Sequence, residues 1–337
     1  MKTILSILVI LLSAQFATAQ WIKQTVNTTA SFRGLAVVNE NVVWASGTGG
    51  TVIKTLDGGK TWSVMIVPGA EKLDFRDIEA FDPNTAYILS IGNGGSSRIY
   101  KTTDGGATWN LQFTNTNSKA FFDAMACWDK NNCIAMADPV DDKFNLIETA
   151  NGGKTWTQID TGGMPAAGSG EAAFAASGTC IITHGNNNAF IVTGGGDARV
   201  FRTIDRGKTW QVADTPMVKG TSGSGIFGIA MRDAKNGVIV GGNYEKPEIA
   251  AKNQIAFTSD GGKSWYQSPE FPHGFRSAIA YLDKYHAVTV GSTGSDTSSY
   301  QLGSWLSIDK SEYNAVQTKG KKVTWAVGAK GLVVRMK

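Results

Sequence analysis

Residues 55–62 read TLDGGKTW, a stretch that joins a carboxylate (Asp57), two glycines, a cation (Lys60) and a tryptophan (Trp62). Taken alone, this stretch fits an acidic active-site loop, a cation site or a tight turn. The choice among these decides the fold, because variants of the same eight residues return along the chain.

This eight-residue motif, named the box below, recurs at a regular spacing. Its other copies are TTDGGATW (102–109), TANGGKTW (149–156), TIDRGKTW (203–210) and TSDGGKSW (258–265), and a worn copy, SIDKSEY, lies at 307–313. Successive box tryptophans are 47, 47, 54 and 55 residues apart. Apolar runs such as FRGLAVV (32–38), VVWASG (42–47) and TVIKT (51–55) predict three strands before a box, and SVMIV (63–67) predicts a fourth after it.

Four short antiparallel strands in a repeat of about 50 residues form one blade of a β-propeller. A pair of β-sandwiches is the alternative, but sandwiches do not need so regular a repeat. Predicted first strands start near residues 32, 75, 121, 172, 226 and 275, which gives six blades.

The chain ends predict a further blade. YNAVQT (313–318), VTWAVG (323–328) and LVVRM (332–336) align with the first three strands of the opening blade, and no fourth strand follows them. WIKQTV (21–26) precedes the opening blade and can supply the missing outer strand, so that no sheet edge stays open. We therefore predict an all-β, seven-bladed propeller spanning residues 20–337 as one domain, with a six-bladed ring as the alternative.

The box itself is predicted to be a structural turn between the third and fourth strands. Glycine adopts positive φ freely, Asp accepts hydrogen bonds from its own turn, and Trp is large enough to wedge against a neighbouring sheet. Asn151 replaces the carboxylate in the third copy and Arg206 replaces a glycine in the fourth, which argues against catalysis. The residues given this structural role are Asp57, Trp62, Asp104, Trp109, Asn151, Trp156, Asp205, Trp210, Asp260 and Trp265.

The pattern S/T-x-D-x-G-x-T-W resembles the Asp-box, or BNR, repeat of sialidases, sortilin-type receptors, some glycoside hydrolases and the photosystem II assembly and stability factor-like propellers. An FR start, a WAxG second strand and the TxDGGxTW box together look most like the last group. That resemblance implies a seven-bladed propeller that helps other proteins assemble. It does not imply that this protein meets a photosystem.

The N-terminus predicts export. Lys2, the apolar run ILSILVILL (4–12) and Ala17-Thr18-Ala19 match a signal peptide cleaved after Ala19, and the run is too short to span a membrane comfortably. The mature chain is therefore expected in the periplasm or outside the cell, without a transmembrane segment. Export permits a disulfide between Cys127 and Cys133, which flank WDKNN, although the sequence leaves open whether it forms.

Composition narrows the partners. The chain carries 32 Lys and Arg against 28 Asp and Glu, a net charge of +4, which does not favour nucleic acid. Only three histidines are present and no Cys/His spacing suggests zinc, so we expect no metal cage and no cofactor. A monomer is expected.

Function is expected on the face opposite the boxes, where first strands begin and where loops join second to third strands. Three of the first-strand starts carry Phe-Arg pairs, ending in Arg33, Arg76 and Arg276, and the Gly/Ala-rich stretch 161–178 is expected to cross this face and deliver Glu171. Loops 137–145 and 291–303 add carboxylates, and the second also carries Tyr300. The candidate binding residues are Arg33, Arg76, Asp77, Asp123, Asp138, Glu171, Arg276 and Asp296.

Two interpretations of these residues remain open. Arginines can form an anion site, because guanidinium binds carboxylate or phosphate in a bidentate manner. Alternatively they form Arg–Asp bridges of little net value. Likewise Asp138, Asp141 and Asp142 suit Ca²⁺, but they lack the alternation of a calcium loop, so a solvated acidic loop is favoured.

The favoured function is a non-catalytic binding or assembly propeller for a protein or an anionic ligand. The alternative is a glycan-processing enzyme, sialidase-like or another glycoside hydrolase, which needs two carboxylates about 5–9 Å apart. No catalytic residue is assigned, because neither a sialidase Tyr–Glu pair nor a nucleophile elbow is recognisable.

Overall fold

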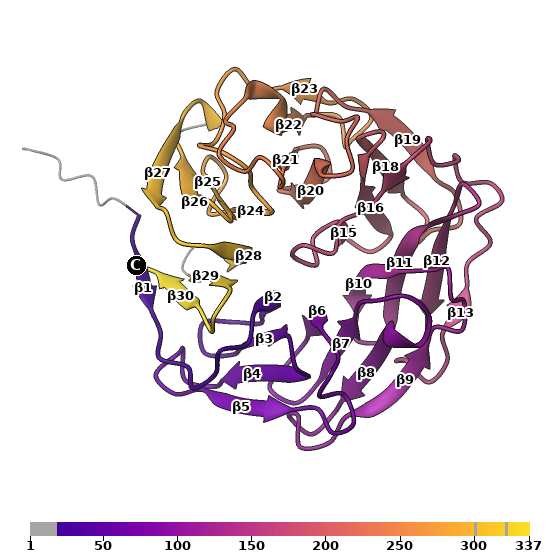
Figure 1. The fold of residues 1–337 in the computed structure, drawn as a ribbon, viewed down its shortest axis with the longest axis vertical. Helices are drawn as coiled ribbons and strands as arrows, with labels where there is room; N and C mark the ends of the chain where they lie inside the picture. Colours follow the sequence, from indigo (N-terminus) through magenta and orange to yellow (C-terminus); the bar gives the residue numbers. More distant parts are fainter. Residues whose placement is uncertain (1–18, 300–301, 321–322) are drawn as a thin grey trace, which may run out of the picture.

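The computed structural model describes residues 19–299, 302–320 and 323–337, whose strands form a ring of seven four-stranded blades (Figure 1). The prediction of seven blades is confirmed, and the six-bladed alternative is wrong. The predicted signal peptide, except for Ala19, and Tyr300 lie outside the described residues. No helix in the described part of the chain is long and apolar enough to cross a membrane.

Blades one to three follow one another along the chain, each strand pairing antiparallel with the next. Blade one comprises β2 Phe32–Val37, β3 Val43–Gly47, β4 Thr51–Thr55 and β5 Ser63–Ile66. Blade two comprises β6 Phe75–Ala80, β7 Ala86–Ser90, β8 Arg98–Thr102 and β9 Asn110–Thr114. Blade three comprises β10 Phe122–Asp129, β11 Asn132–Val140, β12 Lys143–Thr149 and β13 Thr157–Gln158.

Blades four to six continue this order. Blade four comprises β15 Ile181–His184, β16 Asn188–Val192, β18 Arg199–Thr203 and β19 Gln211–Asp214. Blade five comprises β20 Ser224–Met231, β21 Gly237–Asn243, β22 Ile255–Thr258 and β23 Tyr266–Gln267. Blade six comprises β24 Ala278–Tyr281, β25 Ala287–Gly291, β26 Gly294–Ser298 and β27 Trp305–Asp309. Two short 3₁₀ helices, η1 Gly94–Ser96 and η2 Lys252–Gln254, lie in loops.

Blade seven joins the two ends of the chain, as the sequence predicts. It comprises β28 Tyr313–Lys319, β29 Val323–Gly328 and β30 Val333–Met336, with β1 Trp21–Lys23 as the outer strand. Trp21 pairs with Met336 and Lys23 with Val334. The Trp21 indole also donates a hydrogen bond of 2.9 Å to Ser295 Oγ of blade six.

Blade four starts later than predicted. Its first strand begins at Ile181, not near residue 172, because Ile181 and Ile182 are strand formers whereas the preceding stretch is mostly small residues. Residues 171–172 instead form β14 Glu171–Ala172, which pairs with β17 Gly194–Gly195 and through it extends the sheet of blade five.

The position predicted for the sixth, worn copy of the box is also wrong. SIDKSEY (307–313) runs from β27 into β28 rather than between a third and a fourth strand. In blade six that connection lies between β26 and β27 and leads to Trp305, which is buried against Val238 and Val240 of blade five. This copy, SSYQLGSW (298–305), keeps the eight-residue length and the Trp, but the loss of Asp-Gly-Gly hides it from a search for the motif.

The five intact boxes are closed by their own hydrogen bonds. In the first copy, Asp57 accepts bonds from the Thr55 hydroxyl (2.8 Å) and from the Thr61 amide (2.9 Å) and hydroxyl (2.6 Å). These bonds, first those of Thr61, lower the pKa of Asp57 to about 2. Asn151 makes the corresponding bonds to Thr155. A carboxylate used in this way holds a turn and is not poised for catalysis.

Each box couples its blade to the preceding one. Trp62 lies edge-on to Trp325 of blade seven at 5.5 Å between ring centroids, and Trp109 lies edge-on to Trp44 of blade one at 6.5 Å. The cation next to the receiving ring adds a second link: Lys54 lies over Trp44 and donates 2.7 Å to the Gly105 carbonyl in the box of blade two. The repeat therefore specifies contacts between blades as well as turns within them.

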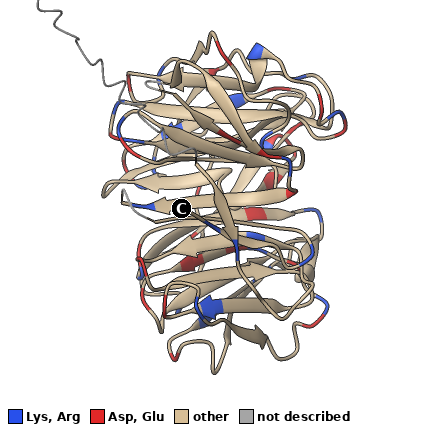
Figure 2. Cartoon of the chain, turned by 90° about the vertical axis from the view of Figure 1, so that its left-hand side faces the viewer, with Lys and Arg blue, Asp and Glu red and all other residues tan. Residues whose placement is uncertain are grey.

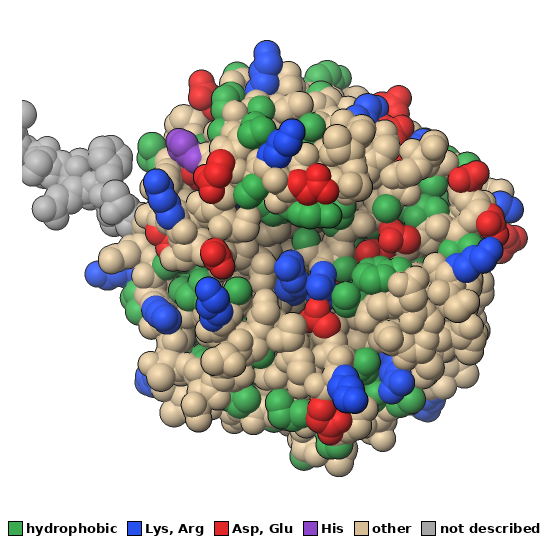
Figure 3. Space-filling model, viewed as in Figure 1, with side chains coloured by type: hydrophobic (Ala, Val, Ile, Leu, Met, Phe, Trp, Pro, Cys, Tyr) green, Lys and Arg blue, Asp and Glu red, His purple; other side chains and the backbone are tan. Residues whose placement is uncertain are grey.

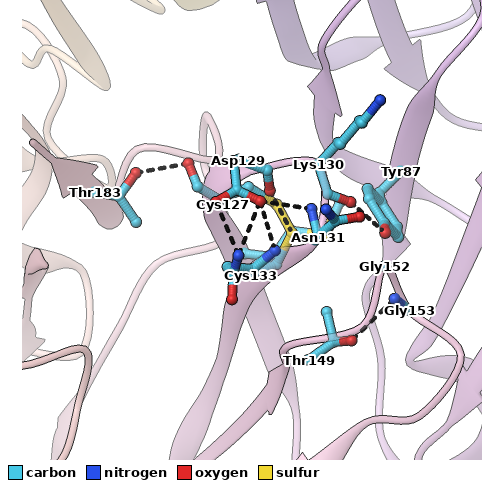
Figure 4. Close-up of a disulfide and its surroundings, with 12 residues drawn as sticks. Tyr87, Cys127, Asp129, Lys130, Asn131, Cys133, Thr149, Gly152, Gly153 and Thr183 are labelled. Carbon is cyan, nitrogen blue, oxygen red and sulfur yellow. Dashed lines mark hydrogen bonds between the residues drawn. A yellow bond between two sulfur atoms is a disulfide. The ribbon is translucent and has the colours of Figure 1, made fainter. Parts of the chain in front are cut away.

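A disulfide links Cys127 and Cys133, which face each other across β10 and β11 (Figure 4). Asp129 closes the hairpin between them by accepting hydrogen bonds from the Asn131 and Asn132 amides. The remaining cysteine, Cys180, is a buried free thiol. Seen from the side, charges of both signs are scattered over the described surface (Figure 2).

Replacing Trp325 with Ala tests the coupling between the first and last blades. Trp325 is fully buried beneath Trp62 and Arg335. Its removal is expected to lower the free energy of unfolding by about 3–5 kcal/mol, because a large cavity opens at the ring closure. Chemical denaturation followed by circular dichroism measures this change. The control, Tyr266→Ala on the exposed outer strand of blade five, should stay within about 0.5 kcal/mol of wild type; equal losses would refute the coupling.

Candidate functional site

A cavity of about 770 Å³ opens at the centre of one face of the ring (Figure 3). This face lies opposite the boxes, because each box turn bonds to the first-to-second connection of its own blade, as Gly58 does to the Asn41 carbonyl at 3.0 Å. In antiparallel blades, first-strand starts and second-to-third loops must then lie at the other end. Arg33, Arg76, Asp123 and Asp138 all line the cavity.

Two neighbouring guanidinium groups form the basic side of the cavity. Arg76 Nε donates 2.7 Å to Asp74, and its Nη1 donates 3.2 Å to the Ala175 carbonyl. Arg33 Nη1 donates 3.0 Å to the Ala176 carbonyl. Burial first, and then the charge of Arg76, lower the pKa of Arg33 to about 10. Arg33 and Arg76 thus lie close together. Among the described residues, Asp74 is the one carboxylate that bonds to either of them.

The chain itself crosses the cavity. The strap, defined here as residues 173–176, places two successive carbonyls on Arg76 and Arg33. Its Ala173 amide donates 2.8 Å to Asp138, and the ring of Phe174 stacks on Phe227 with centroids 3.9 Å apart. The Ala176 amide also donates 2.7 Å to the Phe174 carbonyl, so the arginines hold a tight turn of backbone. Nη2 of each guanidinium has no hydrogen-bond partner in the described part of the chain.

Asp123 and Asp138 form a pair of carboxyl groups beside the arginines. Burial, followed by the charge of Asp138 and a shared side-chain hydrogen bond, raises the pKa of Asp123 well above its usual range. Burial raises the pKa of Asp138 to about 6, against the opposing effect of its bond from Ala173. Two carboxylates in contact cannot both be ionised readily, so the pair holds one proton near neutrality.

Asp77 lies in the channel wall near this pair and is held by backbone donors. Its carboxylate accepts hydrogen bonds from the Ile78 amide at 2.8 Å and the Met125 amide at 2.7 Å, and the side chain is 4% exposed. Burial raises the pKa of Asp77 to about 7 despite these bonds. Asp77 thus joins blades two and three and does not line the cavity.

Arg276 and Asp296 do not belong to an open anion site. Arg276 is 1% exposed, and its Nε donates 2.7 Å to the fully buried Asp296 carboxylate. It also donates to the Phe275 and His273 carbonyls and to the Thr293 hydroxyl. Of the two interpretations of the predicted arginines, the internal bridge fits Arg276, whereas Arg33 and Arg76 retain free donors.

Glu171 likewise forms internal bonds and does not line the cavity. Its carboxylate pairs with Arg199 and accepts hydrogen bonds from the Thr193 hydroxyl (2.5 Å) and the Gly168 amide (2.7 Å). The crossing stretch does reach this face, but it delivers Phe174 and the strap carbonyls instead. Asp141 and Asp142 lie in the exposed tight turn between β11 and β12, both with positive φ.

Aromatic residues form the side of the cavity that the sequence did not single out. The aromatic residues that line it are Phe121, Phe174, Phe227, Tyr244, Phe275 and Tyr313. Phe275 precedes Arg276 and Tyr244 lies in the second-to-third loop of blade five, so both stand at positions where function was expected. Phe275 was not predicted from the sequence because a buried ring is usually only core, as Phe32 and Phe75 of the other two Phe-Arg pairs are.

Comparisons with known proteins bear on the fold. No protein-family model and no curated protein matches the chain. Solved structures that resemble it include YCF48 bound to a D1 peptide (TM-score 0.68, 16% identity, 94% of this chain and 96% of that one). YCF48 from Cyanidioschyzon merolae has the same TM-score and identity, with 94% and 98% covered. Streptogramin B lyase has TM-score 0.66 and 14% identity, with 95% and 97% covered.

At these identities the likenesses show the fold alone. Seven-bladed YCF48 propellers and a lyase share it, so the architecture is compatible with binding and with catalysis. The function of this chain has to be argued from its own cavity.

Replacing Asp123 with Asn tests the proton-sharing pair. A carboxyl whose pKa is raised in the folded state contributes stability below its unfolded pKa near 4 and loses it as pH rises through the folded value. Wild-type stability should therefore fall between pH 5 and pH 8. The variant should show a shallower fall and exceed wild type at pH 8 by about 1 kcal/mol or more, since each pKa unit corresponds to about 1.4 kcal/mol.

Urea denaturation at half-unit pH steps measures these slopes. Asp160→Asn is the matched control, because Asp160 is an exposed turn carboxylate that accepts a bond from Gly162, which Asn can also accept. Asp77 remains in both proteins, so the slope should shrink rather than vanish. Parallel slopes for wild type and Asp123→Asn would contradict the pair.

Proposed function

We propose that this protein is an exported, non-catalytic propeller that binds an extended segment of a partner protein in the cavity, with a carboxylate of that segment on Arg33 and Arg76. The observation that carries the proposal is the strap: the same two guanidinium groups already hold two successive backbone carbonyls and keep further N–H donors. Guanidinium donors bind carboxylates more strongly than neutral carbonyls.

Three further points support this proposal. The sequence resembles Asp-box propellers of the photosystem II assembly and stability factor-like group, which implies assembly of other proteins. A YCF48 structure of similar fold has a D1 peptide bound. The Cys127–Cys133 disulfide suits a periplasmic or secreted chain, as does the predicted signal peptide. We take the active form to be a monomer.

A glycan-processing enzyme is the second candidate, favoured by the acidic pair beside the arginines. The geometry argues against it. Asp123 is 1% exposed and is coupled to Asp138 as a buried pair, whereas the two carboxyl groups of a glycosidase flank the sugar, about 5 Å apart in a retaining enzyme and farther apart in an inverting one. Hydrolysis of an aryl glycoside or sialoside panel that is lost in Asp138→Asn would establish this alternative instead.

Capture of partners from envelope extract tests the binding function. Arg33→Ala/Arg76→Ala should weaken capture of at least one partner about 10-fold to 100-fold, because a charge-assisted hydrogen bond contributes about 1.5–3 kcal/mol. The control, Lys60→Ala/Lys208→Ala, removes the same charge from exposed box turns on the opposite face and should capture as wild type does. Arg276 is left intact, since its buried bridge would confound stability with binding. The same partners in equal yield from both variants would refute the proposed site.

A further inference from the structure

The aromatic side of the cavity is built in two layers. Phe227 and Phe275 are 2% and 5% exposed and meet edge-to-face at 4.7 Å between centroids. Phe174 stacks on Phe227 at an interplanar angle of 7°, and Tyr244 lies edge-on to both rings at 6.2 and 6.1 Å. Tyr244 is 49% exposed and Phe174 is half-buried. Phe227 and Phe275 therefore support the outer layer, and Phe174 and Tyr244 are accessible to a ligand.

The backbone around Phe174 leaves room for its ring. A methyl group at Gly194 would lie 2.3 Å from the Phe174 ring, and one at Gly225 would lie 3.2 Å from it. Gly225 also has φ of 150°, which side chains rarely adopt. Glycines at both positions let the sheet of blade five approach the ring, so Phe174 is held in a fixed slot rather than lying loosely on the surface.

The strap sets the distance between the aromatic rings and the arginines. The residues that follow Phe174 in sequence, Ala175 and Ala176, are those whose carbonyls lie on Arg76 and Arg33. The Ala176 amide donates 2.7 Å to the Phe174 carbonyl, so these residues turn and span less than the roughly 3.3–3.6 Å per residue of an extended chain. A ligand segment that lies along the strap can therefore place a carboxylate at the arginines and a side chain one or two residues away at the outer rings.

The chemistry of the two sides is complementary to one kind of segment. Arg33, Arg76 and the exposed Lys119 favour an anion, and offset or edge-on ring pairs favour an aromatic side chain over a small one. The Tyr244 hydroxyl, which makes no hydrogen bond to any described residue, adds a polar contact at the rim for a ligand backbone.

We propose that Phe174 and Tyr244 form a specificity subsite for an aromatic side chain that lies one or two residues from the carboxylate held by Arg33 and Arg76. The inference rests on the proposed peptide-binding function and names the partner that the cavity selects: an extended acidic-aromatic segment. Its carboxylate comes from an Asp or Glu side chain or from a chain end, and both sources present the same group to the arginines.

A peptide array tests the subsite. Each hexapeptide has one fixed carboxylate, either an Asp side chain or a free C-terminus. A second position, one to three residues from the carboxylate, is varied through all side chains. Control peptides lack the charge, with Asn in place of Asp or an amide in place of the C-terminal carboxylate. A peptide with Phe, Tyr or Trp one or two residues from the carboxylate should bind about tenfold more tightly, or better, than the same peptide with Ala at that position. The two carboxylate arms separate the two sources.

Variants separate the subsite from the proposed function. Tyr244→Ala should abolish most of the Phe-over-Ala preference, Tyr244→Phe should restore it, and Tyr266→Ala, an equally exposed ring on an outer strand, should leave it unchanged. Acidic peptides that bind through Arg33 and Arg76 with no aromatic preference would overturn the subsite and leave the proposed function standing. If no peptide binding depends on the carboxylate or the arginines, the proposed function fails as well.

Discussion

The contact between each box tryptophan and the preceding blade is the interaction on which the rest of the molecule depends. Blades of four short strands bury little by themselves, so a ring is stable only where neighbouring sheets pack face to face. Trp62 on Trp325 and Trp109 on Trp44 supply that packing, and Lys54 and Lys101 tie neighbouring boxes by donating to the Gly105 and Gly152 carbonyls. Blade six has lost the turn chemistry of its box but keeps Trp305 buried, which shows which part of the motif the ring requires.

The packing of the ring brings the first-strand starts together at one central cavity. Two arginines, Arg33 and Arg76, lie there beside the acid pair and the aromatic rings. The strap accepts hydrogen bonds from the arginines and donates one to Asp138, and its Phe174 stacks on Phe227. Such a surface is well suited to holding the backbone of another chain, because it already bonds to two carbonyls of its own. The neighbouring Arg276–Asp296 bridge, at an equivalent first-strand start, shows the closed arrangement that Arg33 and Arg76 do not adopt.

The sequence was sufficient for the architecture because the repeat places the same turn and the same ring in every blade. Five boxes, the count of first strands and the unmatched WIKQTV segment together specify seven blades and their closure. The errors arose where the repeat is interrupted. Small residues before Ile181 carry no strand signal, and the blade-six box has lost Asp-Gly-Gly, so both boundaries depended on packing that only the folded chain reveals.

The site was less accessible from sequence for a different reason. A Phe-Arg pair looks the same whether its guanidinium forms no ion pair, as in Arg33, or is bridged to a carboxylate twenty residues away, as Arg276 is to Asp296. The coupling of Asp123 to Asp138 needs two strands in register. The strap contacts residues of blades one, two, three and five, which no local pattern predicts. Local sequence identifies which residues lie on the cavity face. Hydrogen bonds and ion pairs formed in the folded ring decide which of them keep donors for a ligand.

The last strand to complete the ring comes from the start of the chain. Among the described strands, β1 pairs only with β30, at the opposite end of the sequence, so its strand pairing requires both ends of the chain. Joining such distant segments is entropically slow. During synthesis the N-terminal strand therefore stays unpaired until residues 333–336 emerge, and an unpaired strand can pair with other chains.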